Sequence, residues 1–371
     1  MTLRFQITAE DGAARRGLLI LRSGVVETPA FMPVATYGAV RGVAPPDLVA
    51  LGAQLLLANT FHLHERPGEE AVAKAGGLGG WSGWRGPWLT DSGGYQVTSL
   101  ADRAKVDDDG VAFASPLDGR RRLLTPEGAI AIQEALGADV AMVLDECIPA
   151  ETSEPARIAA ALERSLRWAE RAQRARRRSD QAVFGIVQGG ADLALRRFAA
   201  ASLAALGFDG YAHGGLGLGE AAAARAELVA ETQAALPPHA PRYLMGLGRP
   251  EDLVAGVALG VDLFDCVVPT RHARHGMLFT SRGVLAIRNA RFARDGDPPD
   301  PGCDCPTCRH HARGYLRHLF QVGDALGPRL ATLHNLRFYL GLMERARAAI
   351  TRGAFAALRD EVLGAARARV A

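Results

Sequence analysis

A carboxylate set into an apolar run and followed at once by cations is the feature of this sequence with the clearest chemical potential. Asp265 lies in the apolar run 261–268, and Pro269 ends that run because proline cannot donate to a strand ladder. Arg271 and Arg274 follow. A buried carboxylate is costly unless it is satisfied or used. Asp265 is therefore either a nucleophile or base beside an anionic substrate, or a structural acid paired with one of these arginines.

Other polar residues end apolar runs of the same kind. The eight runs are 30–34, 54–59, 88–91, 140–145, 183–188, 210–214, 242–245 and 263–265. Amphipathic stretches lie between them, and we expect helices at 126–136, 154–177, 192–206, 220–235 and 250–259. Strands alternating with helices predict a parallel sheet with right-handed crossovers. Eight such units favour an α/β fold of the (β/α)₈ (TIM) barrel type, with an open doubly wound sheet as the alternative.

The barrel interpretation predicts where the chemistry takes place. Active sites of such barrels lie at the carboxyl ends of the strands. Polar, acidic or small residues occupy those ends here, at Asn59, Asp91, Asp145, Gln188, Gly214, Gly215, Met245 and Asp265. A purely structural sheet has no need for an acid at three strand ends. The pattern therefore predicts a functional, acidic mouth.

A second cluster of chemical groups lies near the carboxyl end of the chain. Cys303, Cys305 and Cys308 fall within six residues, and His334 follows on a helix expected at about 330–348. Three thiols and one imidazole suit tetrahedral Zn²⁺ with no open position, which indicates a structural ion. His310, His311 and His318 are alternative fourth ligands. Because the strand–helix rhythm stops at Ser281, we expect a barrel at 1–280 and a zinc-binding helical subdomain at 281–371.

Composition limits the classes of protein. The chain has 371 residues, is 48% hydrophobic and carries a net charge of +3. It has no run of eighteen or more apolar residues and no secretory signal at its start, so we expect a cytoplasmic protein without a membrane span. Its five cysteines, three of them clustered, do not form a disulfide framework.

Taken together, the motifs resemble those of the bacterial tRNA-guanine transglycosylases, also called queuine tRNA-ribosyltransferases. The resemblance covers nearly the whole chain. Each motif is weak alone, but their order and spacing are very specific. They are Phe31–Val34, Asn59–Leu63, Asp91–Gln96, Asp145–Cys147, Val187–Gly190, Gly214–Leu216, Tyr243–Gly246, Phe264–Cys266, Pro269–Arg271 and the Cys/His set.

The resemblance implies a barrel enzyme that exchanges a base in RNA without cutting the backbone. It replaces guanine at the wobble position of tRNAs with G-U-N anticodons, and in bacteria the incoming base is usually 7-aminomethyl-7-deazaguanine, a queuosine precursor. Asp265 looks like the nucleophile that forms a covalent ribosyl ester, and Asp91 like the general acid/base. Paired carboxylates are the usual tools of glycosidic exchange. The family also implies a homodimer.

The same resemblance assigns the remaining contacts. We expect the base to be bound by Ser92, Gly93, Gly94, Tyr95, Gln96, Asp145, Gln188, Gly215, Leu216 and Met245. Asp145 would accept from the N–H edge of guanine, whereas Gln188 and the backbone N–H of Gly215 would donate to its acceptors. We expect RNA to contact Gly246, Leu247, Gly248, Arg249, Pro250, Glu251, Asp252, Thr270, Arg271, His272, Ala273 and Arg274.

Departures from the family pattern and rival functions also follow from the residues. His272 and His275 replace the usual asparagines of the basic loop, and Leu218 is bulky where queuine-using enzymes tend to have glycine, which favours the smaller bacterial base. The rivals are a non-catalytic tRNA-binding subunit, a zinc hydrolase and an ordinary glycoside hydrolase. The retained acids Asp91 and Asp265 disfavour the first, and a closed thiolate-rich metal set disfavours the second. The third explains neither the guanine-binding strand ends nor the arginines.

Overall fold

A ring of eight parallel strands forms the centre of the molecule. The computed structural model describes residues 3–100, 104–148, 152 and 154–367. The strand order is β4-β14-β13-β12-β11-β10-β6-β5, and a parallel bridge between Val34 and Leu57 joins the two outermost strands. The fold is therefore the predicted barrel, and the open-sheet alternative is wrong. The strands are β4 (Ala30–Pro33), β5 (Leu56–Ala58), β6 (Trp88–Thr90), β10 (Val140–Met142), β11 (Ala182–Val187), β12 (Gly210–His213), β13 (Arg242–Leu244) and β14 (Leu263–Cys266).

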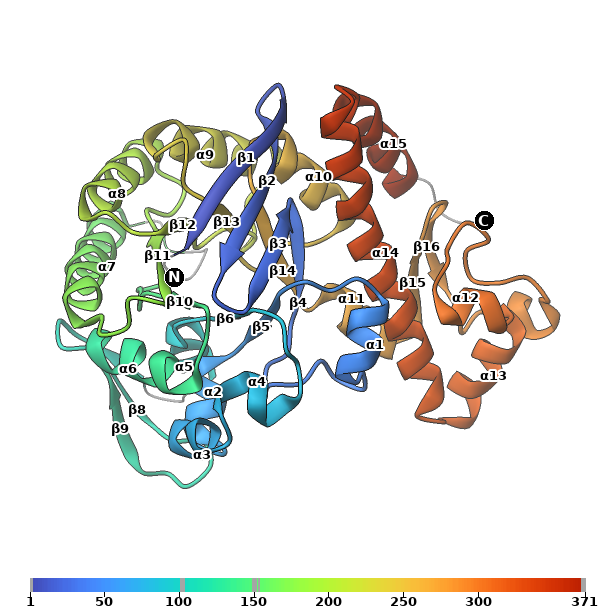
Figure 1. Cartoon of the computed structure of the whole chain (residues 1–371), viewed down its shortest axis with the longest axis horizontal. Coiled ribbons are helices and arrows are strands. Elements are labelled where there is room, and N and C mark those ends of the chain that lie inside the picture. The colour runs from blue at the N-terminus through green and yellow to red at the C-terminus, as the bar shows by residue number, and fades with distance from the viewer. Residues whose placement is uncertain (1–2, 101–103, 149–151, 153, 368–371) are drawn as a thin grey trace.

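Helices follow the strands and cover the outside of the ring (Figure 1). The five predicted helices are present as α6 (Pro126–Leu136), α7 (Pro155–Ala175), α8 (Leu193–Leu206), α9 (Ala222–Ala235) and α10 (Pro250–Ala258). The start of α6 shows why: Thr125 Oγ1 accepts from the backbone N–H of Gly128 at 3.0 Å, and proline occupies the first helical position. Shorter helices are α1 (Pro45–Ala50), α2 (Thr60–Glu65), α3 (Glu69–Lys74), α4 (Gly77–Ser82) and α5 (Gly94–Leu100).

Several strands end earlier than their apolar runs. For example, β10 ends at Met142, whereas its run continues to Asp145. Asn59, Asp91, Asp145, Gln188 and Gly214 consequently stand in the loops after the strands, on the same edge of the barrel. Asp265 is the exception, because it lies within β14. The acidic mouth is thus built mainly from loop residues held by the strands beneath them.

Two three-stranded antiparallel sheets, besides the hairpin of β15 (Met277–Thr280) and β16 (Gly283–Ala286), were not predicted. One consists of β1 (Arg4–Asp11), β2 (Ala14–Leu21) and β3 (Gly24–Thr28); the other of β7 (Lys105–Val106), β8 (Val111–Ala114) and β9 (Arg121–Leu124). Arg15 on β2 forms a buried ion pair with Asp262, which directly precedes β14. The β1–β3 sheet therefore covers the amino-terminal end of the barrel, opposite the acidic mouth.

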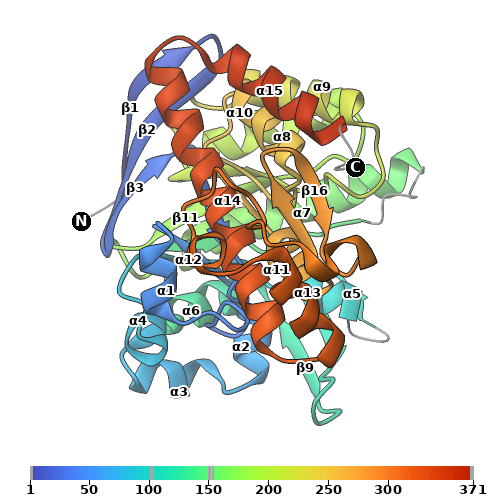
Figure 2. The same cartoon turned by 90° about the vertical axis from the view of Figure 1, so that its right-hand side faces the viewer.

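The carboxyl-terminal part lies beside the barrel and includes one long helix. Its elements are α11 (Val268–Arg274), β15 (Met277–Thr280), β16 (Gly283–Ala286), η1 (Ala290–Arg294), α12 (Pro306–His310), α13 (Arg313–Val322), α14 (Leu326–Thr351) and α15 (Phe355–Arg367). In Figure 1, α14 runs between the barrel and the group formed by α12, α13 and the β15–β16 hairpin. Figure 2 shows α14 from that side, with β1–β3 at one edge of the molecule.

Three details differ from the sequence predictions or extend them. The basic segment after Pro269, expected as a loop, is helix α11, since proline at the start of a helix costs no hydrogen bond. The helix expected at 330–348 runs from Leu326 to Thr351. The predicted boundary at residue 280 falls in the turn of the β15–β16 hairpin. In the described part of the chain, no helix is long and apolar enough to cross a membrane.

Candidate active site

Asp265 lies at the mouth of the barrel and is 9% exposed. Its Oδ1 atom accepts two hydrogen bonds, from the Tyr243 hydroxyl at 2.6 Å and from the backbone N–H of Gly246 at 2.7 Å. Oδ2 accepts none from the described residues. Burial raises the pKa of Asp265, and the bonds from Tyr243 and Gly246 oppose that rise. The result is a carboxylate with one oxygen fixed and the other available.

The interpretation of Asp265 as a structural acid is not supported. No ion pair of Asp265 with Arg271 or Arg274 exists among the described residues, and its polar partners are a phenol and a backbone amide. Arg274 instead donates to the carbonyl of Thr270 within its own helix, at 3.1 Å. The structural alternative that the sequence left open, a pair with one of these arginines, is therefore not found among the described residues.

Asp91 follows β6 and is also buried. Asn59 Nδ2 donates to Asp91 Oδ2 at 2.6 Å, and the backbone N–H of Thr60 donates to Oδ1 at 3.0 Å. Burial raises the pKa of Asp91 to about 7, and the nearby charges of Asp265 and Asp145 add to the rise. A carboxyl that titrates near neutrality can both take and give a proton under physiological conditions. Asp91 thus has the properties of a general acid/base.

Asp145 and Gln188 form a second polar pair at the mouth. Gln188 Nε2 donates to Asp145 Oδ2 at 2.6 Å, and burial raises the pKa of Asp145 to about 6. Gly214 and Gly215 lie against the same amide: a Cβ at Gly215 would come within 2.6 Å of Gln188 Oε1. Gly215 also has a φ of +65°, which favours glycine. These glycines allow the backbone of the β12–α9 loop to approach the pocket closely.

The other predicted base contacts surround these groups. Ser92 and Gly93 are buried between Asp91 and α5, Gly94 is buried at the start of α5, and Leu216 is buried beside the Gly214–Gly215 turn. Gln96 and Met245 are partly buried, whereas Tyr95 is 50% exposed. The structure therefore brings every predicted base-binding residue to the same end of the barrel.

The predicted RNA-binding residues divide by exposure. Gly246, Arg249 and Arg271 are exposed, and Glu251, Asp252, His272 and Arg274 are partly buried. The remaining five are buried, namely Leu247, Gly248, Pro250, Thr270 and Ala273. Burial follows from their small or apolar side chains, which pack beneath the surface. The side chains available to an RNA strand are consequently the charged ones of α10 and α11.

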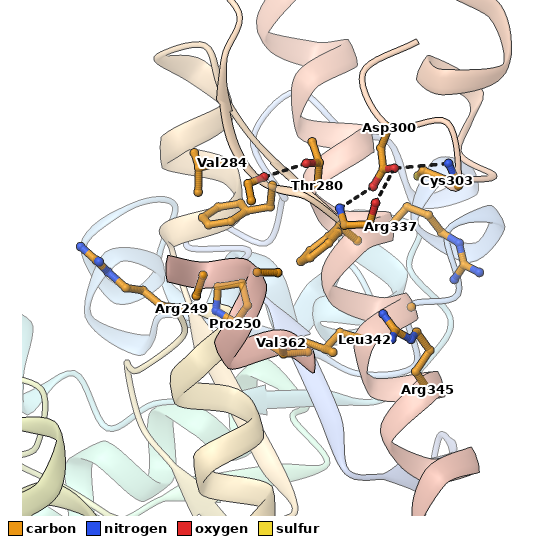
Figure 3. Close-up of a pocket in the computed structure, with 18 of the residues that line it drawn as sticks. Arg249, Pro250, Thr280, Val284, Asp300, Cys303, Arg337, Leu342, Arg345 and Val362 are labelled. Atoms are coloured by element: carbon orange, nitrogen blue, oxygen red, sulfur yellow. Dashed lines mark hydrogen bonds between the residues drawn. The ribbon is translucent and has the colours of Figure 1, made fainter. Parts of the chain in front are cut away.

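A cavity of about 610 Å³ lies next to this charged surface but away from the three acids. It is bordered by α14, α15, the β15–β16 hairpin and the start of α10, and its lining includes Arg249, Pro250 and His272 (Figure 3). Thr280 and Asp300 form hydrogen bonds at its wall. Asp91, Asp145 and Asp265 do not line it. The cavity is therefore distinct from the acidic mouth.

The predicted metal ligands come together. The ligand atoms of Cys303, Cys305, Cys308 and His334 all lie within 4.8 Å of one another. His334 Nδ1 faces the thiols, at 3.2 Å from Cys308 Sγ, while its Nε2 atom lies 2.7 Å from the carbonyl of Phe279. A ring nitrogen anchored to a carbonyl is the usual arrangement behind a metal-binding histidine. This cluster can hold a metal ion, and it uses His334 rather than His310, His311 or His318.

Two residues that support the acids were part of the sequence motifs but had no role assigned to them. Tyr243 reaches Asp265 from the neighbouring strand, and Asn59 reaches Asp91 across the end of β5. A tyrosine within an apolar strand could have been suspected, because a buried phenol needs a partner. The partner itself could not be identified without the strand order.

Comparison with known proteins agrees with this architecture. The family model described as queuine tRNA-ribosyltransferase matches residues 10–368. A queuine tRNA-ribosyltransferase of Stenotrophomonas maltophilia (strain K279a) is 53% identical over 366 residues, which cover 98% of this chain and 97% of the relative. Similar proteins with the same description occur in Xylella fastidiosa (strain 9a5c), at 52% identity over 96% of this chain and 94% of the relative, and in Nitrosomonas europaea, at 51% over 95% of both. The chain therefore belongs to the queuine tRNA-ribosyltransferase (tRNA-guanine transglycosylase) family.

Proposed function

We propose that the protein replaces guanine at the wobble position of tRNAs with G-U-N anticodons by a 7-deazaguanine base, through a covalent intermediate on Asp265. The observation that carries this proposal is the state of the Asp265 carboxylate. Its Oδ1 is fixed by Tyr243 and Gly246, whereas Oδ2 accepts no hydrogen bond from the described residues. A second buried acid, Asp91, titrates near neutrality beside it. A nucleophile and a separate proton carrier are what a double displacement requires.

The two displacements balance as follows. Asp265 Oδ2 attacks the ribose C1′, the bond from C1′ to the guanine N9 breaks, and its electron pair leaves with the base, whose N9 takes up a proton from water at the mouth. The incoming base then gives its N9 proton to Asp91, which passes it to water, and attacks C1′ as the ester bond to Asp265 breaks and returns its electron pair to the carboxylate. Two inversions at C1′ retain the configuration of the nucleoside. The RNA backbone is not cut.

The proposed base pocket uses donors and acceptors in complementary positions. Asp145 accepts from the N–H groups at the guanine edge, and Gln188 and the Gly215 backbone N–H donate to its acceptors. The hydrogen bond between Gln188 and Asp145 holds both groups at the mouth at 2.6 Å. Tyr95 and Met245 are the proposed stacking partners on the two faces of the ring, because aromatic and thioether groups pack well on flat rings. The target nucleotide is turned out of the anticodon loop to reach this pocket.

The anticodon strand lies, in this proposal, across α11 and the start of α10. The exposed guanidinium groups of Arg249 and Arg271 are suited to phosphates, because arginine offers several donors in a fixed plane. The partly buried Arg274 and His272 add positive charge or stacking surface beside them. We also propose a homodimer, following the family.

The metal in the Cys303, Cys305, Cys308 and His334 cluster is, we propose, a structural Zn²⁺. Three thiolates and one imidazole match the preference of zinc, and they fill all four positions of a tetrahedral ion. The site lies outside the barrel, apart from the acids. It therefore joins α12 to α14 and takes no part in the exchange.

The incoming base is proposed to be 7-aminomethyl-7-deazaguanine rather than queuine. Leu218, in the β12–α9 loop, is partly buried and bulkier than glycine, so it reduces the room for the cyclopentenediol of queuine. In a competition between the two labelled bases, we expect the aminomethyl base alone to enter the tRNA, and Leu218→Gly to admit queuine. Equal incorporation of both by the unmodified protein contradicts this specificity.

The exchange mechanism is tested with a tRNA bearing a G-U-N anticodon on a denaturing gel. We expect a denaturation-resistant complex with the unmodified protein and with Asp91→Asn, but none with Asp265→Asn. A complex that depends on Asp91 instead would mean that Asp91 is the nucleophile and Asp265 the general acid/base. If guanine exchanges without a trapped complex, single-turnover kinetics of the two variants decide between them. Absence of both complex and exchange would favour a non-catalytic tRNA-binding homologue.

A further inference from the structure

A buried arginine lies directly behind the base-binding edge of the pocket. Arg196, on α8, is 0% exposed. Its Nε donates to the carbonyl of Gly190 at 2.7 Å, and its Nη2 donates to the carbonyl of Gly214 at 3.0 Å. Among the described residues, Nη1 has no hydrogen-bond partner and no carboxylate lies within ion-pair distance of this guanidinium. Glu220 favours the charged form from a greater distance, so the direct partners of the charge are backbone carbonyls.

Such an arrangement is expensive for a role in stability alone. A buried cation without a counter-charge loses its hydration and gains little in return. Burial lowers the pKa of Arg196 to about 10, which still leaves the side chain protonated at neutral pH. Since an apolar side chain would fill the same space at lower cost, a positive charge at this place calls for an explanation in terms of function.

The two carbonyls belong to the loops that carry the base-binding groups. Gly190 lies in the loop after β11, which begins with Gln188, and Gly214 directly follows β12 and precedes Gly215. The fit is tight, because a Cβ at Gly189 would lie 3.0 Å from the backbone nitrogen of Arg196. Arg196 therefore ties both loops to α8 at a fixed separation.

One of these bonds also has an electronic consequence. The Gly214 carbonyl and the Gly215 N–H are the two ends of a single peptide group. A cation bound to the carbonyl oxygen withdraws electrons from that peptide and makes its N–H a stronger donor, as in any chain of hydrogen bonds in a low-dielectric interior. The Gly215 N–H, which faces the base in the proposed function, therefore gains partial positive charge from its interaction with Arg196.

We propose that Arg196 is a positioning residue for base recognition: it fixes and polarises the Gly214–Gly215 peptide, so that the Gly215 N–H selects a purine with an oxygen acceptor at C6. This inference rests on the proposed function of the pocket. It goes beyond that function by assigning the selection of 6-oxopurines to a side chain that never touches the base.

Binding of two free bases tests the inference without tRNA or turnover. Guanine carries the C6 oxygen, whereas the fluorescent 2-aminopurine lacks it; 2-aminopurine binding is followed directly and guanine binding by its displacement. We expect Arg196→Met to weaken guanine binding about tenfold and to change 2-aminopurine binding by less than about twofold. Arg196→Lys, which keeps the charge but cannot span both carbonyls, should fall between the unmodified protein and Arg196→Met.

A matched control is available on α14. Arg347 is 8% exposed and also donates to backbone carbonyls, those of Pro29 at 2.9 Å and Glu27 at 3.5 Å, away from the acidic mouth. Arg347, which also pairs with Glu27 at 3.9 Å, can be replaced in the same way, and Arg347→Met should leave the affinities for both bases unchanged. This comparison separates base recognition from the general cost of removing a buried arginine.

The outcomes are distinct. Equal weakening of both bases in the Arg196 variants, or no weakening of guanine binding, overturns the inference, as does an unmodified protein that does not prefer guanine. If guanine binds with the expected pattern but never exchanges into tRNA, the proposed function fails and the inference holds. If neither base binds to the unmodified protein, both fail.

Discussion

Three aspartates at one barrel mouth differ because their neighbours differ. Asp265 is held by a phenol and a backbone amide, Asp91 by the Asn59 amide and a backbone amide, and Asp145 by the Gln188 amide. Burial raises the pKa of all three. Since repulsion from Asp265 and Asp145 adds to burial at Asp91, the pKa of this carboxyl rises to about 7, whereas that of Asp145 rises to about 6. Its surroundings, rather than its residue type, make Asp91 suited to carry a proton.

Removal of the Tyr243 hydroxyl tests the support of the nucleophile. In Tyr243→Phe, Asp265 Oδ1 loses one of its two donors, so the carboxylate is less well oriented and its pKa rises. We expect kcat of guanine exchange to fall about tenfold at pH 7, with recovery toward higher pH. Tyr211→Phe, a buried tyrosine on the adjacent strand β12, should have no such effect. A loss that does not change with pH would contradict the role assigned to Tyr243.

The raised pKa of Asp91 should also make the unfolding free energy of the protein depend on pH. Its folded pKa of about 7 lies above the ordinary value of 3.8, so the folded protein binds this proton more tightly than the unfolded chain does. Stability is therefore lost as the pH rises from about 4 to 7, and the full cost remains above that. We expect Asp91→Asn to exceed the unmodified protein in unfolding free energy by on the order of 2–4 kcal/mol at pH 8, and to match it near pH 4. Denaturant titrations at the two pH values measure this gap; a gap independent of pH would refute it.

At the scale of elements, helix α14 connects the metal cluster to the barrel. His334 lies on one face of the helix, and Asn335, the next residue, binds the backbone at Pro269, Met277 and Phe279. Tyr339, one turn further, donates to the carbonyl of Gly248 at 2.6 Å. The same helix therefore carries a ligand of the cluster and the side chains that bind the backbone around α11 and β15. The proposed structural Zn²⁺ would therefore stabilise this region without entering the exchange.

Removal of the metal should consequently destabilise the region around α12 and α13, without a direct effect on the three aspartates of the barrel mouth. We expect about one equivalent of zinc in the purified protein, and none in His334→Ala. A strong chelator should lower the melting temperature and expose α12 and α13 to proteolysis before activity is lost. His318→Ala, at an exposed histidine of α13, is the matched control and should keep the metal. Loss of exchange with no change in melting temperature would point to a catalytic metal.

At the scale of the whole molecule, the two ends of the barrel have different tasks. The β1–β3 sheet closes one end, where the buried Arg15–Asp262 pair ties β2 to the start of β14. The other end remains lined by loops and carries the three acids. Separation of a stabilising end from a reactive end is the general rule for this fold. It explains why the acids that follow β6 and β10 lie at the same end of the barrel as the acid of β14, although their sequence positions are far apart.

The assembly of the molecule is open to direct measurement. One chain has a mass of 39.3 kDa, and the family implies two chains per particle. We expect light scattering after size-exclusion chromatography to give about twice that mass, and dilution to shift it downward if the interface is small. A mass of one chain at all concentrations would contradict the homodimer.

The sequence by itself determined the alternation of strands and helices, the acidic strand ends and the three clustered thiols. The spacing of apolar residues, the capping residues of helices and the spacing of metal ligands are local properties. The apolar runs, Thr125 and the Cys303–Cys308 cluster could therefore be interpreted without coordinates. The β1–β3 and β7–β9 sheets were missed, because their strands lie outside the strand–helix alternation that the sequence interpretation followed.

Only the tertiary structure decided which groups meet. The bond from Tyr243 to Asp265 spans 22 positions and that from Arg196 to Gly214 spans 18, and each depends on the register between neighbouring strands and helices. The choice of His334 over three nearer histidines depends on how α14 packs against α12. Whether an acid is paired, raised in pKa or left with an available oxygen is fixed by distances and burial across the barrel, which no stretch of sequence contains.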